Sequence, residues 1–178
     1  MNHFGTKQLE TDRLLLRRFE EKDAEALFGS YINQKEFLYY ANKSPQTLED
    51  IKSFLMAISK RYQEKNFYNW VIVLKSSKRI VGSVNLRITD QTECAELNYA
   101  IDNRYTGNGY MTEALEAIKE FCLKDLRIKR LQGGCCIENI ASKRVMEKSG
   151  LQYEDTLKQS IRLEDGYHDM LMYAIVND

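Results

Sequence analysis

The amino-acid sequence predicts an α+β fold built on a central, mixed and mostly antiparallel β-sheet flanked by helices. Three observations lead to this prediction. β-rich runs occur at the start, in the middle and at the end of the chain, two helical segments separate the first run from the second, and one long helix lies between two strands in the second half. A helical crossover joins parallel strands, whereas short turns join antiparallel ones. The predicted order is therefore β-α-α-β-β-β-α-β-α-β-β.

Seven runs are predicted to be strands, and those at residues 68–74 and 80–86 are rich in β-branched or aromatic residues. The seven runs are residues 13–19, 68–74, 80–86, 95–101, 130–137, 151–157 and 167–176. A short polar break at residues 76–78 separates the second run from the third, which predicts a hairpin.

Four segments repeat apolar residues at the spacing of one helix face. They are residues 23–31, 47–62, 110–126 and 141–148. A break at residues 44–47 precedes the second helix, where Thr47 can act as the N-cap and Asp50, three residues later, completes a capping box. Gly150 follows the fourth helix and predicts its C-terminus, because glycine tolerates the left-handed backbone found there.

Composition narrows the classes of function. The 178 residues fit one domain over 1–178, and a single proline leaves little room for linkers. Since 26 Lys and Arg residues balance 26 Asp and Glu residues, no global field attracts nucleic acid or an anionic membrane, and a polyanionic ligand must be held locally. No apolar run approaches the roughly 20 residues of a membrane-spanning helix. The first residues lack the pattern of a signal peptide, so we expect a cytoplasmic protein.

The four cysteines are Cys94, Cys122, Cys135 and Cys136. They contain no Cys-x-x-Cys pair, and two adjacent residues of a strand point to opposite faces of the sheet, so their spacing disfavours zinc and we expect no metal. Buried, reduced thiols of a cytosolic protein are the prediction.

A glycine-containing segment, Thr106 to Leu115, lies between a predicted strand and the long helix. Gly107 and Gly109 permit backbone angles that let consecutive N–H groups turn to one side, and the helix start adds unpaired donors and a positive dipole. This pattern fits a site for a diphosphate, although the glycines alone are equally consistent with a plain strand-to-helix turn. A Walker loop would end in Gly-Lys-Ser/Thr, and a dinucleotide loop would follow an early strand, so both are disfavoured.

Residues 107–115 resemble the pyrophosphate loop of the GNAT acetyltransferases. Further blocks at residues 9–17, 96–99, 139–151 and 167–173 resemble the bacterial ribosomal-protein N-terminal acetyltransferase branch of that superfamily. The resemblance covers almost the whole chain in the expected order. It implies a GNAT-type fold with acetyl-CoA as the cosubstrate.

Two registers against the Gln/Arg-x-x-Gly-x-Gly/Ala consensus are open. Arg104 with Gly107 and Gly109 fits the consensus letters. The alternative places Thr106 at the Gln/Arg position, Gly109 at the first glycine and Met111 at the last small position. The second is preferred because it matches the form of the ribosomal-protein branch.

The resemblance implies which residues contact acetyl-CoA. They are Asn98, Tyr99, Ile101, Thr106, Gly107, Asn108, Gly109, Tyr110, Met111, Thr112, Asn139, Ser142 and Lys143. Pantetheine is expected along residues 98–101, with the Ile101 N–H as an oxyanion donor. By the same resemblance Asn139 holds the pantetheine arm and Ser142 donates a hydrogen bond to the leaving sulfur. Asn-x-x-Ser before a helix is also the pattern of an ordinary helix N-cap. The sequence is equally consistent with Lys143 on a solvated helix face and with Lys143 bound to a phosphate of the cofactor.

The general base is the least determined role. Ile161 stands where a relative has a glutamate, so that base cannot be carried over. Glu96 is the next candidate, with an ion pair as its alternative role. Neither His3 nor His168 is placed by the sequence to act on a cysteine or an amine. Since an α-amine has a pKa of about 8, solvent can also take the proton.

The sequence therefore predicts an enzyme that transfers an acetyl group directly to an amine, without an acetyl-enzyme. A protein N-terminus, for example of a ribosomal protein, is the leading acceptor. A small amine (a polyamine, an aminoglycoside or an amino-acid analogue) and a non-catalytic acetyl-CoA sensor are the alternatives, and homo-oligomerisation is left open. The acceptor side is expected from residues 23–65 and 160–166, where the resemblance is weakest.

Overall fold

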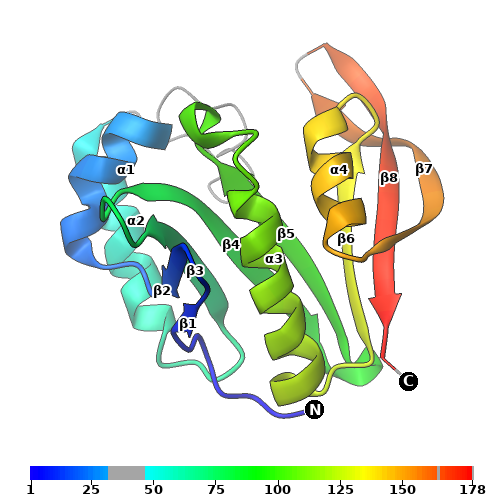
Figure 1. Cartoon of the computed structure of the whole chain (residues 1–178), viewed down its shortest axis with the longest axis horizontal. Coiled ribbons are helices and arrows are strands. Elements are labelled where there is room, and N and C mark those ends of the chain that lie inside the picture. The colour runs from blue at the N-terminus through cyan, green and yellow to red at the C-terminus, as the bar shows by residue number, and fades with distance from the viewer. Residues whose placement is uncertain (32–46, 164, 178) are drawn as a thin grey trace. The chain divides into compact units, whose positions relative to one another are not determined.

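The computed structural model describes residues 1–31, 47–163 and 165–177. These residues form a mixed sheet of eight strands in the order β1-β2-β3-β4-β5-β6-β8-β7, flanked by four α-helices (Figure 1). The chain divides into two compact units. The N-terminal unit holds His3–Asn85 and Tyr99–Tyr110, and the C-terminal unit holds Met1–Asn2, Leu86–Asn98 and Met111–Asp178. Strands β4 (Ile80–Thr89) and β5 (Cys94–Ile101) run through both units.

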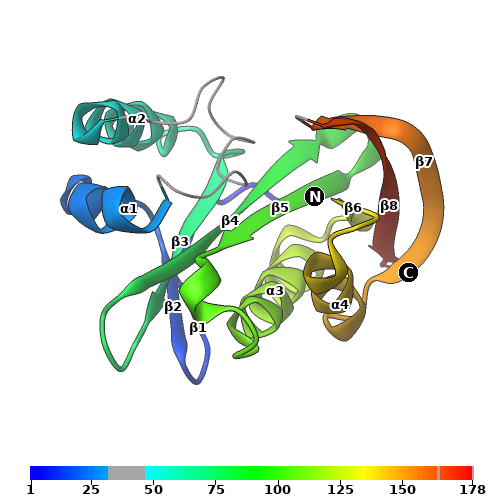
Figure 2. The ribbon, with the colours of Figure 1, turned by 90° about the horizontal axis from the view of Figure 1, so that it is seen from above.

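In the N-terminal unit, β2 (Leu14–Arg17) pairs antiparallel with β1 (Leu9–Glu10) and with β3 (Tyr68–Leu74). Helices α1 (Ala24–Tyr31) and α2 (Leu48–Arg61) lie side by side over one face of these strands (Figure 2). Every residue of β3 is buried, as a continuous apolar run predicts for a strand that is covered on both faces. The apolar core between helices and strands comprises Phe19, Ala24, Leu27, Ile51, Leu55, Ile58, Tyr62, Phe67, Val71, Val73, Ile80 and Ala100.

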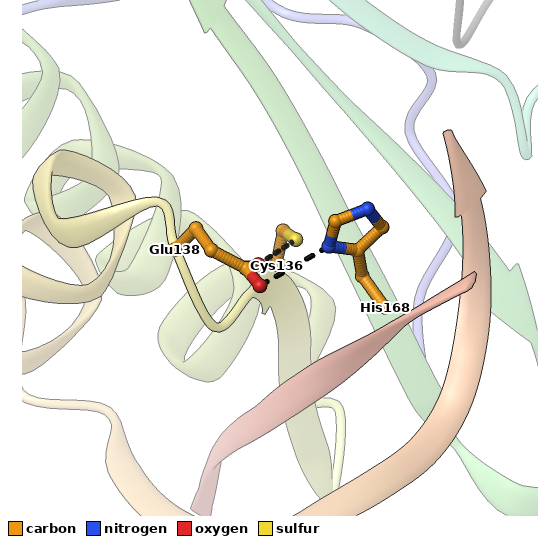
Figure 3. A group of neighbouring side chains, drawn as sticks. All are labelled: Cys136, Glu138 and His168. Carbon is orange, nitrogen blue, oxygen red and sulfur yellow. Dashed lines mark hydrogen bonds and ion pairs between the residues drawn. The ribbon is translucent and has the colours of Figure 1, made fainter. Parts of the chain in front are cut away.

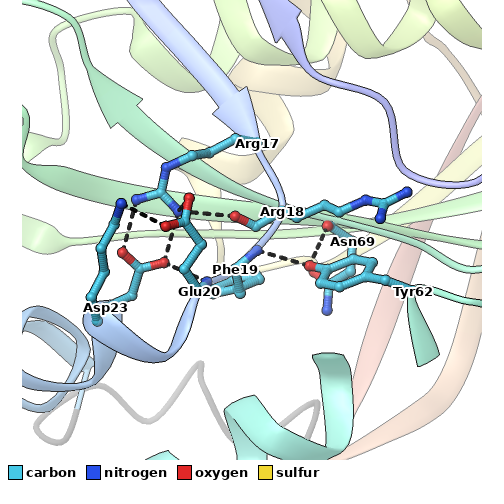
Figure 4. Close-up of polar contacts among 8 residues, drawn as sticks. Arg17, Arg18, Phe19, Glu20, Asp23, Tyr62 and Asn69 are labelled. Atoms are coloured by element: carbon cyan, nitrogen blue, oxygen red, sulfur yellow. Dashed lines mark hydrogen bonds and ion pairs between the residues drawn. The ribbon is translucent and has the colours of Figure 1, made fainter. Parts of the chain in front are cut away.

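A buried polar network fixes the chain between β2 and α1 (Figure 4). The Tyr62 hydroxyl accepts a hydrogen bond from the Phe19 N–H at 3.0 Å and donates one to the Asn69 carbonyl at 2.9 Å. Arg17 forms a bidentate pair with Asp23, with both N···O distances at 2.8 Å. Burial raises the pKa of Tyr62 to about 12, so the phenol stays protonated and keeps both bonds.

In the C-terminal unit, β6 (Arg130–Cys136) pairs parallel with β5 and antiparallel with β8 (Gly166–Val176), and β8 pairs antiparallel with β7 (Gln152–Leu163). The helical crossover α3 (Tyr110–Glu120) therefore joins parallel strands, as predicted. Helix α4 (Ile140–Lys148) packs beside α3 (Figure 2).

Both predicted helix caps are confirmed. The Thr47 hydroxyl accepts from the Asp50 N–H at 3.1 Å, and the Asp50 carboxylate accepts from the Thr47 N–H at 2.9 Å. Gly150 follows α4 at φ +88°, and its N–H bonds the Glu147 carbonyl at 3.1 Å. The predicted break at residues 44–46 lies outside the described residues.

The structure corrects several predicted elements. The two-residue strand β1 was missed because it is too short to show a period, and it exists through its register with β2. Strand β2 ends at Arg17 instead of residue 19, because the Phe19 N–H donates to the Tyr62 hydroxyl and not to a neighbouring strand. The helix predicted over residues 110–126 is α-helical only to Glu120 and continues as a π-helix over Phe121–Leu126.

Strand β7 extends past the predicted end at residue 157 to Leu163. A register shift between Leu157 and Ile161 interrupts its pairing with β8. At this shift Gln159 has φ 47°, and the Asp169 carboxylate accepts from its N–H at 3.0 Å and pairs with Lys158 at 2.7 Å. The extension was not predicted because an irregular strand breaks the two-residue alternation.

Among the described residues, no helix is long and apolar enough to cross a membrane.

Candidate active site

The segment between β5 and α3 forms a hydrogen-bonded loop in the N-terminal unit. Asp102 is 1% exposed, and its carboxylate accepts from the Arg104 N–H at 2.9 Å and pairs with the Arg104 guanidinium at 2.5 Å. The loop then passes through Gly107 and Gly109, both at φ +78°. L-residues with a Cβ rarely adopt this conformation, so the two glycines set the path of the backbone here.

The loop presents unpaired backbone donors. Within the part of the chain that the structure describes, no protein group accepts from the N–H of Gly107, Asn108 or Gly109. The side chains shape the loop instead: the Asn108 amide donates to the carbonyls of Tyr105 and Thr106 at 3.1 Å each. Free N–H groups that lead into a helix start make an anion site suited to a diphosphate.

Arg13 is a functional candidate that the sequence analysis missed. Its guanidinium donates to the Asn108 carbonyl at 3.1 Å and lies 4.6 Å from the centre of the Tyr110 ring. A Cβ added to Gly109 would lie 3.5 Å from the same guanidinium. The sequence places Arg13 only at the start of a strand, because no local pattern shows that a residue 95 positions away reaches the loop.

The ends of the loop have mainly structural side chains. The Thr106 hydroxyl donates to the Asn103 carbonyl at 2.9 Å, and the Met111 side chain is 3% exposed. Met111 therefore belongs to the core, and Thr112 beside it is half-buried. Both proposed registers of the consensus use the same free N–H groups, so the geometry of the loop is compatible with each.

A second group of predicted residues lies at the start of α4 in the C-terminal unit. Asn139 is the N-cap, and its side-chain oxygen accepts from the Ser142 N–H at 3.0 Å. The Ser142 side chain bonds the Cys135 thiol, whose pKa is raised because burial outweighs that bond. Lys143 is half-exposed, and its N–H donates to the Asn139 carbonyl at 3.1 Å. The cap role is thus present, and the Asn139 amide is exposed beside it.

The carboxylate of Glu96 forms an ion pair, which was its alternative role. Its Oε2 lies 2.8 Å from Arg87. The parallel register of β5 and β6 ends at the Glu96–Gln132 pair, although both strands continue. Just beyond this point a Cβ on Gly133 would meet the Leu97 side chain at 3.1 Å and its carbonyl at 3.3 Å, so a glycine is needed for the strands to approach.

The end of β5 carries the predicted oxyanion donor. The Asp102 N–H donates to the Val81 carbonyl of β4 at 2.8 Å. Since backbone N–H groups alternate in direction along a strand, the Ile101 N–H points to the opposite edge of β5, away from β4. Asn98, Tyr99 and Ile101 are all half-exposed.

The cysteines and His168 correct two expectations. All four thiols are free, but only Cys122 and Cys135 are buried, whereas Cys94 and Cys136 are partly exposed. His168 is not remote from the cysteines: it lies in a cluster with Cys136 and Glu138 (Figure 3). Register places it there, because β8 pairs with β6. His168 is also the cross-strand partner of Ile161.

The structure thus assembles the predicted residues in two groups. Arg13 joins the loop in the N-terminal unit, while Ser142 joins Asn139 and Cys135 in the C-terminal unit. The first group offers backbone donors suited to an anion, and the second offers the Asn139 and Ser142 side chains.

Comparison with known proteins agrees with this geometry. A family model described as an acetyltransferase (GNAT) domain matches residues 13–152. The chain is 29% identical over 169 residues to the uncharacterized N-acetyltransferase YoaA of Bacillus subtilis (strain 168). The aligned region covers 94% of this chain and 96% of YoaA. It is 24% identical over 172 residues to the ribosomal-protein-serine acetyltransferase of Escherichia coli (strain K12). This aligned region covers 94% of this chain and 95% of that enzyme.

A solved structure is similar over nearly the whole chain. The GNAT-family acetyltransferase from Bacillus anthracis superposes with a TM-score of 0.79 at 28% identity, covering 96% of this chain and 98% of that one.

Proposed function

We propose that this chain, which belongs to the acetyltransferase (GNAT) family, transfers the acetyl group of acetyl-CoA to the terminal amine of a protein, with ribosomal proteins as the leading class. The broader activity is that of an acetyl-CoA-dependent N-acetyltransferase, as in the relatives it matches. The ribosomal-type acceptor is supported by the similarity to the Escherichia coli serine acetyltransferase along almost the full length of both chains.

The observation that carries the proposal is the loop at residues 107–109. Its free N–H groups face no protein acceptor among the described residues and suit the diphosphate of acetyl-CoA. The Arg13 guanidinium, held against the loop by Asn108 and Tyr110, adds a local positive charge to a chain whose net charge is zero.

The chemistry at the other end needs few groups. The amine nitrogen attacks the thioester carbon, the carbonyl oxygen gains charge, and the carbon–sulfur bond then breaks to release CoA as a thiolate. In the proposal the Ile101 N–H donates to the oxygen, Asn139 holds the pantetheine arm, and the Ser142 hydroxyl donates to the sulfur. Backbone donors suit the first task because they are fixed before the reaction starts.

The amine proton leaves through solvent, with Glu96 as the candidate base. Glu96 is paired with Arg87, so it serves best through a bridging water. A protein α-amine has a pKa of about 8, which leaves an appreciable neutral fraction near neutral pH, so a strong base is not required.

The deciding experiment compares matched acceptors, with release of CoA measured as free thiol. One peptide has a free N-terminus and an internal lysine, and a second peptide is identical but N-terminally acetylated. The remaining acceptors are small amines, namely polyamines and aminoglycosides. We expect turnover with the first peptide and none with the second.

Each other result has a defined meaning. Equal turnover of both peptides would show acetylation of lysine and contradict the N-terminal acceptor. Turnover of small amines alone would assign the alternative acceptor class. Tight acetyl-CoA binding without turnover of any amine would identify a sensor.

A further inference from the structure

The side chains of Cys136, Glu138 and His168 form a compact group in the C-terminal unit, which we call the β6–β8 cluster (Figure 3). The Cys136 thiol donates to Glu138 Oε2 at 2.6 Å, and Glu138 Oε1 lies 3.1 Å from His168 Nδ1. The sulfur, oxygen and nitrogen atoms all lie within 4.8 Å of one another. Three different donor atoms thus converge in a space the size of a metal coordination sphere.

Strand register holds two of these side chains together. Cys136 ends β6 directly opposite Met170 of β8. His168 is two residues from Met170, so it points to the same face of the sheet and is the diagonal neighbour of Cys136. The main chain, rather than a chance side-chain contact, therefore brings the sulfur and the imidazole together.

The turn after β6 carries the third donor. The Ile137 N–H extends the ladder by donating to the Asp169 carbonyl at 3.0 Å. The Asn139 N–H then donates back to the Cys136 carbonyl at 2.9 Å and closes a tight turn. Glu138 lies within this turn, so its carboxylate is directed back toward Cys136.

A fourth residue orients the imidazole. His168 Nε2 lies 2.9 Å from Asp165 Oδ1, on the side of the ring away from the cluster. When Nε2 carries the proton and donates it to Asp165, Nδ1 presents its lone pair to Glu138 and Cys136. Metal-binding histidines nearly always donate their other N–H to such a partner, which fixes the tautomer and the ring.

We propose that the β6–β8 cluster is a zinc site, with the Cys136 thiolate, the Glu138 carboxylate and His168 Nδ1 as ligands and Asp165 as the residue that orients the imidazole. A sulfur, a nitrogen and an oxygen donor suit Zn²⁺, whereas Mg²⁺ and Ca²⁺ prefer oxygen ligands alone. Three protein ligands leave the fourth tetrahedral position to water. On binding, the Cys136 S–H bond breaks, the proton passes to solvent, and a Zn–S bond replaces the hydrogen bond to Glu138.

The spacing of the three ligands along the chain does not match the common zinc-binding motifs. Cys136 and Glu138 are separated by one residue, whereas His168 lies 30 residues after Glu138. The sequence-based expectation of no metal depended on cysteine spacing, which does not report on ligands contributed by a neighbouring strand.

Cobalt is the probe for the test, because Co²⁺ enters zinc sites and reports on its ligands by absorption. The purified full chain is titrated with Co²⁺ and then with Zn²⁺. We expect one equivalent of Co²⁺ to give a thiolate-to-metal charge-transfer band and the visible bands of a tetrahedral ion, and Zn²⁺ to abolish both. The Cys136→Ala variant loses the charge-transfer band, whereas the matched Cys135→Ala variant, changed at the adjacent buried thiol, keeps it.

Two further variants test the remaining roles. His168→Gln removes the nitrogen ligand and should weaken Co²⁺ binding at least about 10-fold, and Asp165→Asn should weaken it about 10-fold through the ring. Asp125→Asn, at an exposed aspartate of the π-helix, is the matched control and should bind as the parent does. Circular dichroism confirms that each variant is folded.

The proposal fails if the folded parent gives no charge-transfer band. It also fails if that band survives Cys136→Ala, or if Cys135→Ala removes it. Unchanged affinity in Asp165→Asn would remove Asp165 from the site.

Discussion

The loop at residues 107–109 and the β6–β8 cluster are two candidate binding regions that the sequence reveals to different degrees. The loop is visible in the sequence because its conformation is dictated by residues that are adjacent: Gly107 and Gly109 take φ +78° and free the N–H groups around them. The cluster is invisible there, since Cys136 and His168 meet only through the pairing of β6 with β8. Backbone conformation is local information, whereas side-chain convergence depends on register.

The contrast is not complete, because the loop also has a partner from far along the chain. Arg13 reaches it from the start of β2, 95 residues from Asn108. The following variants test how far the loop is a local device and how far each region depends on distant residues.

The largest effect is expected from Gly109→Val. A β-branched residue at φ +78° is strained, and its Cβ would lie against the Arg13 guanidinium and beside the N–H donors. We expect calorimetry to show a loss of acetyl-CoA affinity of more than about 100-fold, equivalent to about 3 kcal/mol or more. Gly29→Val is the control, because nothing lies within 4 Å of a Cβ at that helical position. Unchanged affinity in a folded Gly109→Val variant would contradict the phosphate role.

The next effect concerns Ser142, which stands in the second predicted group. Ser142→Ala removes a donor to the leaving sulfur, and a hydrogen bond to a charged group is worth about 1.5–3 kcal/mol. We expect kcat to fall about 10- to 100-fold while acetyl-CoA affinity changes little. Ser77→Ala, at an exposed turn, is the matched control. A parent-like rate under conditions where chemistry is limiting would leave Ser142 with structural contacts alone, namely its backbone N–H on the Asn139 cap and its side chain on Cys135.

Tyr62 tests a buried network that depends on distant residues in the same way as the β6–β8 cluster. Tyr62→Phe leaves the Phe19 N–H and the Asn69 carbonyl without their partner, so unfolding in urea should show a loss of about 1–3 kcal/mol. Tyr167→Phe, at a 63% exposed tyrosine, should change stability by less than about 0.5 kcal/mol.

The same tyrosine predicts a pH dependence. Burial raises the pKa of Tyr62 to about 12, whereas an unfolded tyrosine has a pKa of about 10. Between these values the folded state binds more protons than the unfolded state, so stability falls as pH rises through this window. We expect a flatter decline between about pH 10 and pH 12 in Tyr62→Phe than in the parent. Parallel curves would show that Tyr62 titrates alike in both states.

A smaller effect is expected at the distant partner of the loop. Arg13→Ala should raise the KM for acetyl-CoA about 3- to 10-fold, since an exposed charge contact is worth about 1 kcal/mol. Arg13→Lys should be intermediate, because lysine keeps the charge but not the planar stacking on Tyr110. Arg61→Ala, at an exposed helix end, is the control. Equal KM values for Arg13→Ala and Arg61→Ala would show that the loop binds acetyl-CoA without help from Arg13.

The smallest effect is an expected absence of change. Although Cys136 lies near His168, burial and the Glu138 carboxylate raise the pKa of its thiol, which disfavours a nucleophilic thiolate. Intact-protein mass after mixing with acetyl-CoA alone should therefore show no acetyl adduct. A stoichiometric adduct that amine removes and Cys136→Ala lacks would establish a ping-pong route in place of direct transfer.

The sequence determined much of the architecture. The α+β class, the parallel crossover through α3, the caps at Thr47 and Gly150, and the glycine loop all follow from periodicity and from residues with restricted or unusual backbone preferences. The family followed from the joint agreement of several blocks, and the match over residues 13–152 confirms it. One domain over 1–178, the individual site roles and the acceptor amine stay predictions.

Tertiary structure decided what depends on pairing across long separations. It placed Arg13 on the loop, bound Glu96 to Arg87 and brought His168 to Cys136. A local pattern reports the φ and ψ preferences of neighbouring residues and which face of an element is apolar. It does not report which strand lies beside which, or in what register, because those are set by the packing of the whole core.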